Sequence, residues 1–296
     1  MKKNYKSVLL LVIFILFLIL ILIHSSDIGK LVTDYSLLFL TKLFPASFLF
    51  FLFSSLFIEY GLIEMIQYYF HFQASQFYVL FISLISGFPA GAKCIKELTE
   101  ADIIDSDSAN KMILFSHFPN PLFVFGSVGS VIGNYHLTLY LYLSIILSNI
   151  IIFLLQRYPK VQIKNTVPSF KDFSSVLGKS IMKSFQTILL IYGTSLFFYL
   201  MITLIIPYFS LTTYQYVFLN GLFDLTKGVF ATELLHNSIL RVLFILFFIQ
   251  FGGISIHMQV KGILANSSIS YYSFVKGRIV STILSFFIFL LLGFII

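Results

Sequence analysis

Apolar residues occur along the chain in long blocks, with short polar stretches between them. Nine blocks can be distinguished, at residues 8–23, 37–58, 77–94, 112–133, 137–155, 185–206, 214–230, 240–256 and 279–296. A helix needs about 20 mainly apolar residues to cross a bilayer, and most of the blocks approach this length. The pattern therefore predicts an all-α, polytopic integral membrane protein.

The composition supports the same fold class. Of the 296 residues, 58% are hydrophobic and 10% are charged, whereas a soluble domain has about 25% charged residues. So few charges do not cover the surface of a soluble protein, and a water-soluble globule is excluded. The single cysteine, Cys94, rules out an internal disulfide, and no cluster of histidines and cysteines has the spacing of a zinc site. We therefore expect neither a metal nor another cofactor.

The net charge of +7 comes from basic residues near the ends of the apolar blocks, where lipid head groups and membrane topology account for them. No nucleic-acid recognition module is visible, so nucleic acid is not an expected partner. Lys2, Lys3 and Lys6 precede the first block, and no small-residue cleavage site follows it. We therefore expect a retained first helix in a multi-pass protein of the cell membrane, with the N-terminus in the cytoplasm.

Five of the blocks read as plain spanning helices, and four are interrupted. The interruptions place glycine, proline or ionisable residues inside apolar sequence, at residues 86–93, 118–121, 220–228 and 251–259. A continuous membrane helix avoids such residues because they remove backbone hydrogen bonds or place charge in lipid. The four segments are therefore predicted to be broken helices.

The order of the blocks repeats. A plain helix, two interrupted segments and a plain helix occur in residues 31–155 and again in residues 185–296, after an N-terminal tip and helix at residues 1–30. The linker, 156–184, carries six basic residues and one acid, Asp172, so we expect it to be cytoplasmic, with an amphipathic surface helix in its later part.

Basic residues also fix the expected orientation of the two repeats. Lys261, Lys276 and Arg278 are predicted to lie in a cytoplasmic loop before the last helix. Corresponding helices of the repeats then run in opposite directions, and one interrupted segment of each pair is predicted to be re-entrant. Inverted repeats with broken helices are typical of membrane transporters, in which the breaks form the substrate site near the membrane midplane.

The candidate binding residues lie at these breaks: Gly87, Pro89, Gly91, Lys93, Asn120, Asp224, Thr226, Ser255, His257 and Gln259. Lys93 is expected to neutralise an anionic solute; alternatively, it is an interfacial lysine at the start of a loop. Asp224 either contacts the solute or pairs with Lys227, three residues further on. Thr226 is the better candidate for a direct hydrogen bond.

The polar residues of the last break alternate with apolar ones. Ser255, His257 and Gln259 would share one side of an extended segment, which predicts an unwound stretch with His257 as a donor or proton-linked group. The alternative places His257 at a cytoplasmic interface. Asn120 lies between two prolines, and its amide either orients the solute or satisfies the backbone carbonyls that the prolines free.

Four motifs also resemble those of a known family. They are GFPAGAK (87–93), NPLF followed by GSVG (120–129), TKG (226–228) and GGISIHMQ (252–259). In this order they resemble the YlbJ-type sporulation integral membrane proteins and, more remotely, nucleoside-recognition (Gate) domain proteins. The resemblance implies paired Gate-like repeats and a role in moving dipicolinate, an aromatic dicarboxylate, or in handling nucleosides. The chain departs from the pattern at residues 117–119 and at Asp224, where the family has glutamate.

Enzyme motifs are absent, so catalysis is not expected. The sequence predicts a carrier for a small polar solute, anionic or heteroaromatic, that works within a lipid bilayer. The alternatives are a nucleoside-type transporter, a channel, and a receptor or assembly subunit that transports nothing. A homo-oligomer or a partner membrane protein is compatible with each of them.

Overall fold

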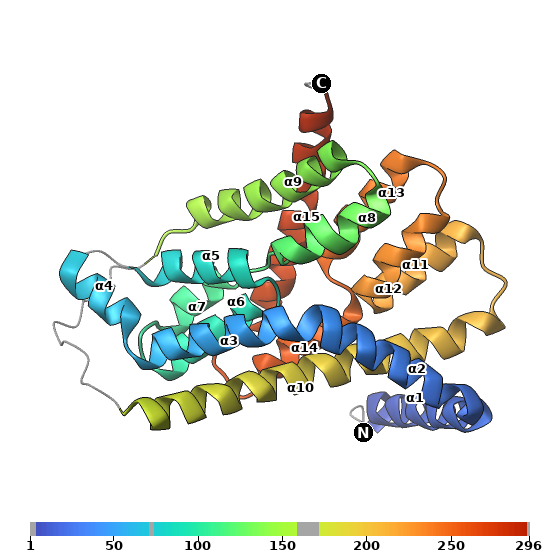
Figure 1. The fold of residues 1–296 in the computed structure, drawn as a ribbon, viewed down its shortest axis with the longest axis horizontal. Helices are drawn as coiled ribbons and strands as arrows, with labels where there is room; N and C mark the ends of the chain where they lie inside the picture. Colours follow the sequence, from blue (N-terminus) through green and yellow to red (C-terminus); the bar gives the residue numbers. More distant parts are fainter. Residues whose placement is uncertain (1–3, 71–73, 159–171, 295–296) are drawn as a thin grey trace.

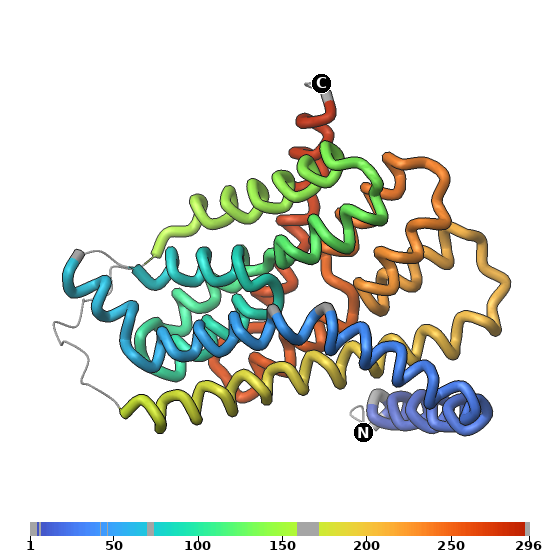
Figure 2. The backbone as a smooth tube through the Cα atoms, viewed as in Figure 1, coloured from blue at the N-terminus to red at the C-terminus, as the bar shows by residue number. Residues whose placement is uncertain are grey.

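The structure, a computed structural model, describes residues 4–70, 74–158 and 172–294, and these ranges contain helices and connections but no strand (Figure 1 and Figure 2). The elements are α1 (Asn4–Ile23), α2 (Ser25–Leu38), η1 (Phe39–Leu43), α3 (Phe44–Glu59), α4 (Leu62–Phe70), α5 (Ser75–Ser86), α6 (Ala90–Glu100), α7 (Ser106–Met112), η2 (Phe123–Val128), α8 (Gly129–Ile132), α9 (Tyr135–Leu155), α10 (Phe173–Ile205), η3 (Ile206–Tyr208), α11 (Thr213–Phe223), α12 (Leu225–Ala231), η4 (Thr232–Leu234), α13 (Ser238–Phe251), α14 (Ile254–Ile263) and α15 (Tyr271–Phe294). Lys2, Lys3 and residues 159–171 of the predicted linker lie outside the described residues.

Several helices are long and apolar enough to cross a membrane. Four meet this test by themselves, at Tyr135–Leu155, Phe173–Tyr208, Ser238–Ile263 and Tyr271–Gly293, and two bent helix pairs bring the number to six if each pair is one span. The predicted fold class is confirmed: the chain is an all-α, polytopic membrane protein.

The N-terminal region contains a second helix directly after the expected first one. The chain bends by 98° after Ile23 and continues as a second helix, α2, which begins at Ser25. Asp27 lies in the first turn of α2, where a negative charge favours the helix N-terminus. A π-helical turn, η1, then connects α2 to α3.

α10 also corrects the expectation of a separate surface helix before the span. It is one helix of 33 residues that starts after Asp172, whose side chain accepts a hydrogen bond from the Ser175 backbone. At about 1.5 Å per residue it is about 50 Å long, more than the hydrocarbon thickness of about 30 Å. Near its start, Lys179 and Lys183 form ion pairs with Glu59 of α3 at 2.8 Å and 3.0 Å. The predicted amphipathic segment is therefore the first part of the long helix.

The helices that correspond in the two predicted repeats contact each other. α3 packs against α10, and α9 packs against α15. Each repeat also holds a pair of short helices in close contact, α5 with α6 and α11 with α12 (Figure 1). The opposite orientation of the repeats remains a prediction.

The prediction that Arg278 lies in a cytoplasmic loop before the last helix is wrong. It lies inside α15 and is fully buried, with an exposed fraction of 0%. Its guanidinium donates hydrogen bonds to the Leu114 carbonyl at 3.0 Å, to the His117 and Gln250 carbonyls at 3.4 Å, and to Asn149 Oδ1 at 3.3 Å. One side chain thus connects the broken segments of both repeats to α9.

Candidate functional site

The first repeat presents a helix pair with a sharp tip. α5 ends at Ser86, and α6 begins at Ala90. Gly87, at the tip between them, has a φ of +76°, which residues other than glycine rarely adopt. Gly91 packs so closely on the Ser116 carbonyl that a Cβ would collide with it. The glycines and Pro89, the residue before α6, therefore shape the tip.

The second broken segment of this repeat lies against that tip. The Phe88 backbone N–H donates to the Phe118 carbonyl at 2.7 Å, and a Cβ on Gly87 would meet the Asn120 backbone. Asn120 Oδ1 accepts from the Leu122 N–H at 2.8 Å, and its amide nitrogen donates to the Ser86 carbonyl at 3.4 Å. Asn120 therefore satisfies backbone groups at both breaks.

The second repeat has the same arrangement. α11 and α12 meet at Asp224, whose carboxylate accepts from the Lys227 backbone N–H at 2.9 Å and so caps α12. Gly253, at the break between α13 and α14, lies against the Gly221 and Leu222 carbonyls, which leave no room for a Cβ. In each repeat, one break is thus pressed against the other.

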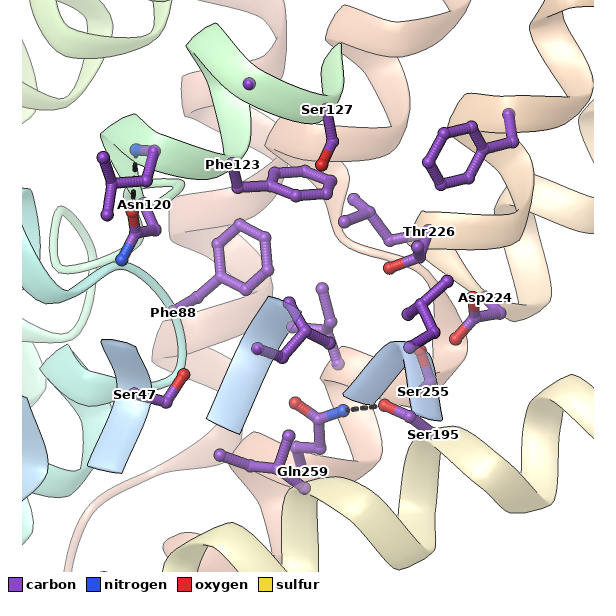
Figure 3. Close-up of a pocket in the computed structure, with 18 of the residues that line it drawn as sticks. Ser47, Phe88, Asn120, Phe123, Ser127, Ser195, Asp224, Thr226, Ser255 and Gln259 are labelled. Carbon is purple, nitrogen blue, oxygen red and sulfur yellow. Dashed lines mark hydrogen bonds between the residues drawn. The ribbon is translucent and has the colours of Figure 1, made fainter. Parts of the chain in front are cut away.

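All four breaks border one cavity of about 750 Å³ (Figure 3). This volume lies within the range of about 300–1,000 Å³ that is common for small-molecule sites. The side chains that line it comprise hydroxyl groups, two amides, one carboxylate and a set of apolar and aromatic groups: Tyr35, Leu38, Thr41, Leu43, Ser47, Ser86, Phe88, Asn120, Leu122, Phe123, Gly126, Ser127, Ser130, Ile191, Ser195, Asp224, Leu225, Thr226, Phe230, Ser255, Ile256 and Gln259.

Five of the ten predicted binding residues line this cavity: Asn120, Asp224, Thr226, Ser255 and Gln259. They come from three of the four breaks, and the fourth contributes Ser86 and Phe88, which flank the predicted Gly87. The spacing of glycine, proline and polar residues thus located segments that lie together in the fold.

Lys93 does not line the cavity. It lies within α6, so it does not begin a loop, and its Nζ is 3.1 Å from Glu97 Oε1. It also donates to Ser55 Oγ of α3 at 2.7 Å, and Ser55 donates to Glu97 at 2.8 Å. Lys93 and Glu97 have exposed fractions of 5% and 6%. The charge that was expected to meet an anion is therefore neutralised inside the helix packing.

The last break corrects the prediction of an unwound stretch. Residues 254–263 form α14, so only Gly252 and Gly253 interrupt the helix. Ser255 and Gln259 are four residues apart and share the face toward the cavity. His257 does not line it: its ring contacts the Tyr271 hydroxyl at 2.8 Å and the Phe251 carbonyl at 3.0 Å.

The chain is similar to the sporulation integral membrane protein YlbJ of Bacillus subtilis (strain 168), with 26% identity over an alignment of 286 positions that covers 80% of this chain and 70% of the relative. The chain is YlbJ-like. This similarity confirms the resemblance to YlbJ-type proteins that the four motifs indicated, whereas the resemblance to Gate domain proteins stays a prediction. No family model matches the chain, and no solved structure matches it.

The YlbJ-like chain also places residues in its cavity that the sequence did not single out. Tyr35 comes from α2 and Ser195 from the middle of α10, which reads as a plain helix. Ser195 Oγ accepts a hydrogen bond from Gln259 at 2.7 Å (Figure 3). Isolated hydroxyls are common in membrane helices, so only the contact with Gln259 distinguishes Ser195.

Proposed function

We propose that this YlbJ-like protein is a carrier for a small polar solute, which binds in the cavity between the broken helices. The observation that supports the proposal is the convergence of four breaks, two from each repeat, on one cavity. Broken helices expose backbone and polar side chains where a solute can replace water, and rocking of the repeats around such a site gives alternating access. We place the carrier in the cell membrane with a cytoplasmic N-terminus.

The cavity chemistry favours a solute with an aromatic ring and no net negative charge. Phe88, Phe123 and Phe230 offer ring faces, and Asn120 and Gln259 offer amides that both donate and accept. Among the Asp, Glu, Lys, Arg and His residues that the structure describes, Asp224 is the one that lines the cavity. A dicarboxylate such as dipicolinate would meet this carboxylate without a lysine or arginine on the wall. We therefore propose a nucleoside-type solute ahead of an aromatic dicarboxylate.

Ligand-dependent thermal stabilisation of the protein in lipid nanodiscs tests the site and the solute class together. The probes are uridine, adenosine and dipicolinate. A ligand at about 100 times its dissociation constant adds about 2.7 kcal/mol to the stability of the native state. A nucleoside is expected to stabilise wild type and to lose this effect in Gln259→Ala, whereas Gln156→Ala, which removes an amide outside the cavity, retains it.

Flux then separates the carrier from its rivals. Uptake of the stabilising probe into proteoliposomes is expected to saturate with concentration and to be accelerated by unlabelled probe on the opposite side. Binding without flux would identify a receptor or an assembly subunit, and discrete single-channel currents would identify a channel. Stabilisation by dipicolinate alone would overturn the proposed solute class.

A further inference from the structure

The carboxylate of Asp224 is buried in the cavity wall without a counter-ion. Its residue has an exposed fraction of 3%. One oxygen, Oδ1, accepts the Lys227 backbone N–H at 2.9 Å, and no ion pair to Asp224 is formed by the residues that the structure describes. A lone buried charge of this kind costs several kcal/mol, and protonation is the simplest way to remove it.

The nearest cation is held elsewhere. Lys227 Nζ donates to Thr203 Oγ1 of α10, and it lies 4.9 Å from the centre of the Tyr199 ring. The ammonium is thus bound to α10, although the backbone N–H of the same residue is the group that the Asp224 carboxylate caps. It contributes a long-range attraction and leaves the carboxylate free to exchange a proton.

The other ionisable groups around Asp224 come from the helices packed against it. Tyr35 of α2 and Tyr199 of α10 lie within electrostatic range of it, and Tyr199 interacts in turn with Asp34 of α2 and Tyr216 of α11. From α14, the nearest group is the Ser255 hydroxyl, which lies beside Asp224 without reaching hydrogen-bond geometry (Figure 3). His257 of the same helix is bonded to Tyr271 and Phe251.

We propose that Asp224 binds the proton that couples solute movement to a proton gradient. The inference rests on the proposed carrier function and adds its energy source. In the outward-facing state, the second oxygen, Oδ2, takes a proton from cavity water, and the Ser255 hydroxyl beside Asp224 can accept a hydrogen bond from the O–H that forms. Solute binding excludes water and retains the proton. After the repeats have moved, the proton returns to water on the cytoplasmic side together with the solute.

Accumulation driven by a pH gradient tests the coupling directly. Proteoliposomes with an alkaline interior are loaded from outside with radiolabelled uridine as the probe. One proton per solute across one pH unit supports about tenfold accumulation in wild type. The neutral isostere Asp224→Asn is expected to lose accumulation in response to the pH gradient, whatever its rate of uridine exchange at equilibrium. Asp107→Asn, which removes an exposed carboxylate on α7, is the matched control and should accumulate as wild type does.

The outcomes separate this inference from the proposed function. Wild-type uptake that ignores the pH gradient, or accumulation by Asp224→Asn, overturns the coupling role and leaves the carrier intact. Accumulation driven by a sodium gradient in its place also overturns it. Absence of both uptake and exchange in wild type overturns the proposed function for this probe.

A second measurement needs no solute. Infrared spectra of the protein in lipid, recorded over a neutral pH range, report the C=O stretch of protonated carboxylic acids. A titrating band is expected in wild type and in Asp107→Asn, and it should be missing in Asp224→Asn. An identical band in all three proteins overturns the proton site whatever the solute is.

Discussion

Phe88 stacks on His117, with ring centroids 4.5 Å apart and an angle of 10° between the ring planes. Phe88 lines the cavity, whereas His117 lies behind it and contacts the Ile249 carbonyl of α13 through Nε2 at 3.2 Å. The aromatic wall contributed by the first repeat is therefore supported by the second.

Replacement of Phe88 in this aromatic wall should lower the affinity for the solute more than the stability of the fold. Stacked aromatic rings contribute about 0.5–1.5 kcal/mol beyond their buried area, so Phe88→Ala should lower the affinity for an aromatic probe by up to about tenfold. The affinity is measured by equilibrium binding in nanodiscs. Phe81→Ala removes a ring from the exposed face of α5 and should leave the affinity unchanged. Equal affinities of both variants and wild type would exclude Phe88 from the binding site.

The close contact between α11 and α12 predicts a sharp steric effect. A Cβ on Gly228 would collide with Gly221 Cα, which belongs to the backbone and cannot rotate away. Overpacking of this kind costs about 1–3 kcal/mol, so Gly228→Ala should lower the melting temperature. The measurement is the fraction of monodisperse protein left after heating.

Gly193 provides the matched control. It lies in the interior of α10, and a Cβ there would have no neighbour within 4 Å. Gly193→Ala should melt at or slightly above the wild-type temperature because alanine favours the helix. A melting temperature of Gly228→Ala that matches wild type would show that α11 and α12 separate easily.

Loss of Arg278 should disconnect the two repeats. Hydrogen bonds to a charged group contribute about 1.5–3 kcal/mol each, and Arg278→Gln removes several of them at once. Arg278→Lys should also melt early, since an ammonium cannot spread over the same acceptors as a guanidinium. Lys276→Gln removes an exposed charge two residues away and should leave the melting temperature unchanged. Wild-type stability of both Arg278 variants would refute the connecting role.

Substitutions of Lys93 and Glu97 should have coupled effects on the stability of the protein. Lys93→Met leaves a buried carboxylate unpaired, which typically costs about 3–5 kcal/mol, and Glu97→Gln leaves the ammonium unpaired. The double variant Lys93→Met/Glu97→Gln should recover most of the lost stability and bind the probe as wild type does. Loss of probe binding in the stable double variant would instead return Lys93 to the binding site.

The sequence predicted the breaks well because glycine, proline and polar residues disrupt membrane helices locally. Gly87, Asn120, Asp224 and Gly252 each mark a real interruption. The pattern could not show how short each interruption is. Ser255 to Gln259 alternate in polarity as an extended segment would, yet the residues are helical because buried backbone must make its hydrogen bonds within the segment.

The partners of the buried charges do not follow from the polar and apolar pattern alone. Because an intramembrane charge is functional by default, Lys93 is expected to meet the solute or, alternatively, to begin an interfacial loop, but Glu97 lies one helical turn away and neutralises it. Together with Lys261 and Lys276, Arg278 predicts a cytoplasmic loop before the last helix. An arginine inside an apolar helix was the available signal, and its carbonyl partners come from segments more than 100 residues away as well as from nearby ones.

Two π-helical turns border the cavity, and both belong to the first repeat: η1 next to Leu38, and η2 with Phe123 and Ser127 on the wall. A π turn stores one surplus residue, and tightening it to an α turn advances the helix by one position, a screw rotation of about 100°. The described part of the second repeat, residues 185–294, contains no such turn. Such a change of helix register is therefore open to the wall that the first repeat contributes, whereas the described part of the second repeat has no π turn that could supply one.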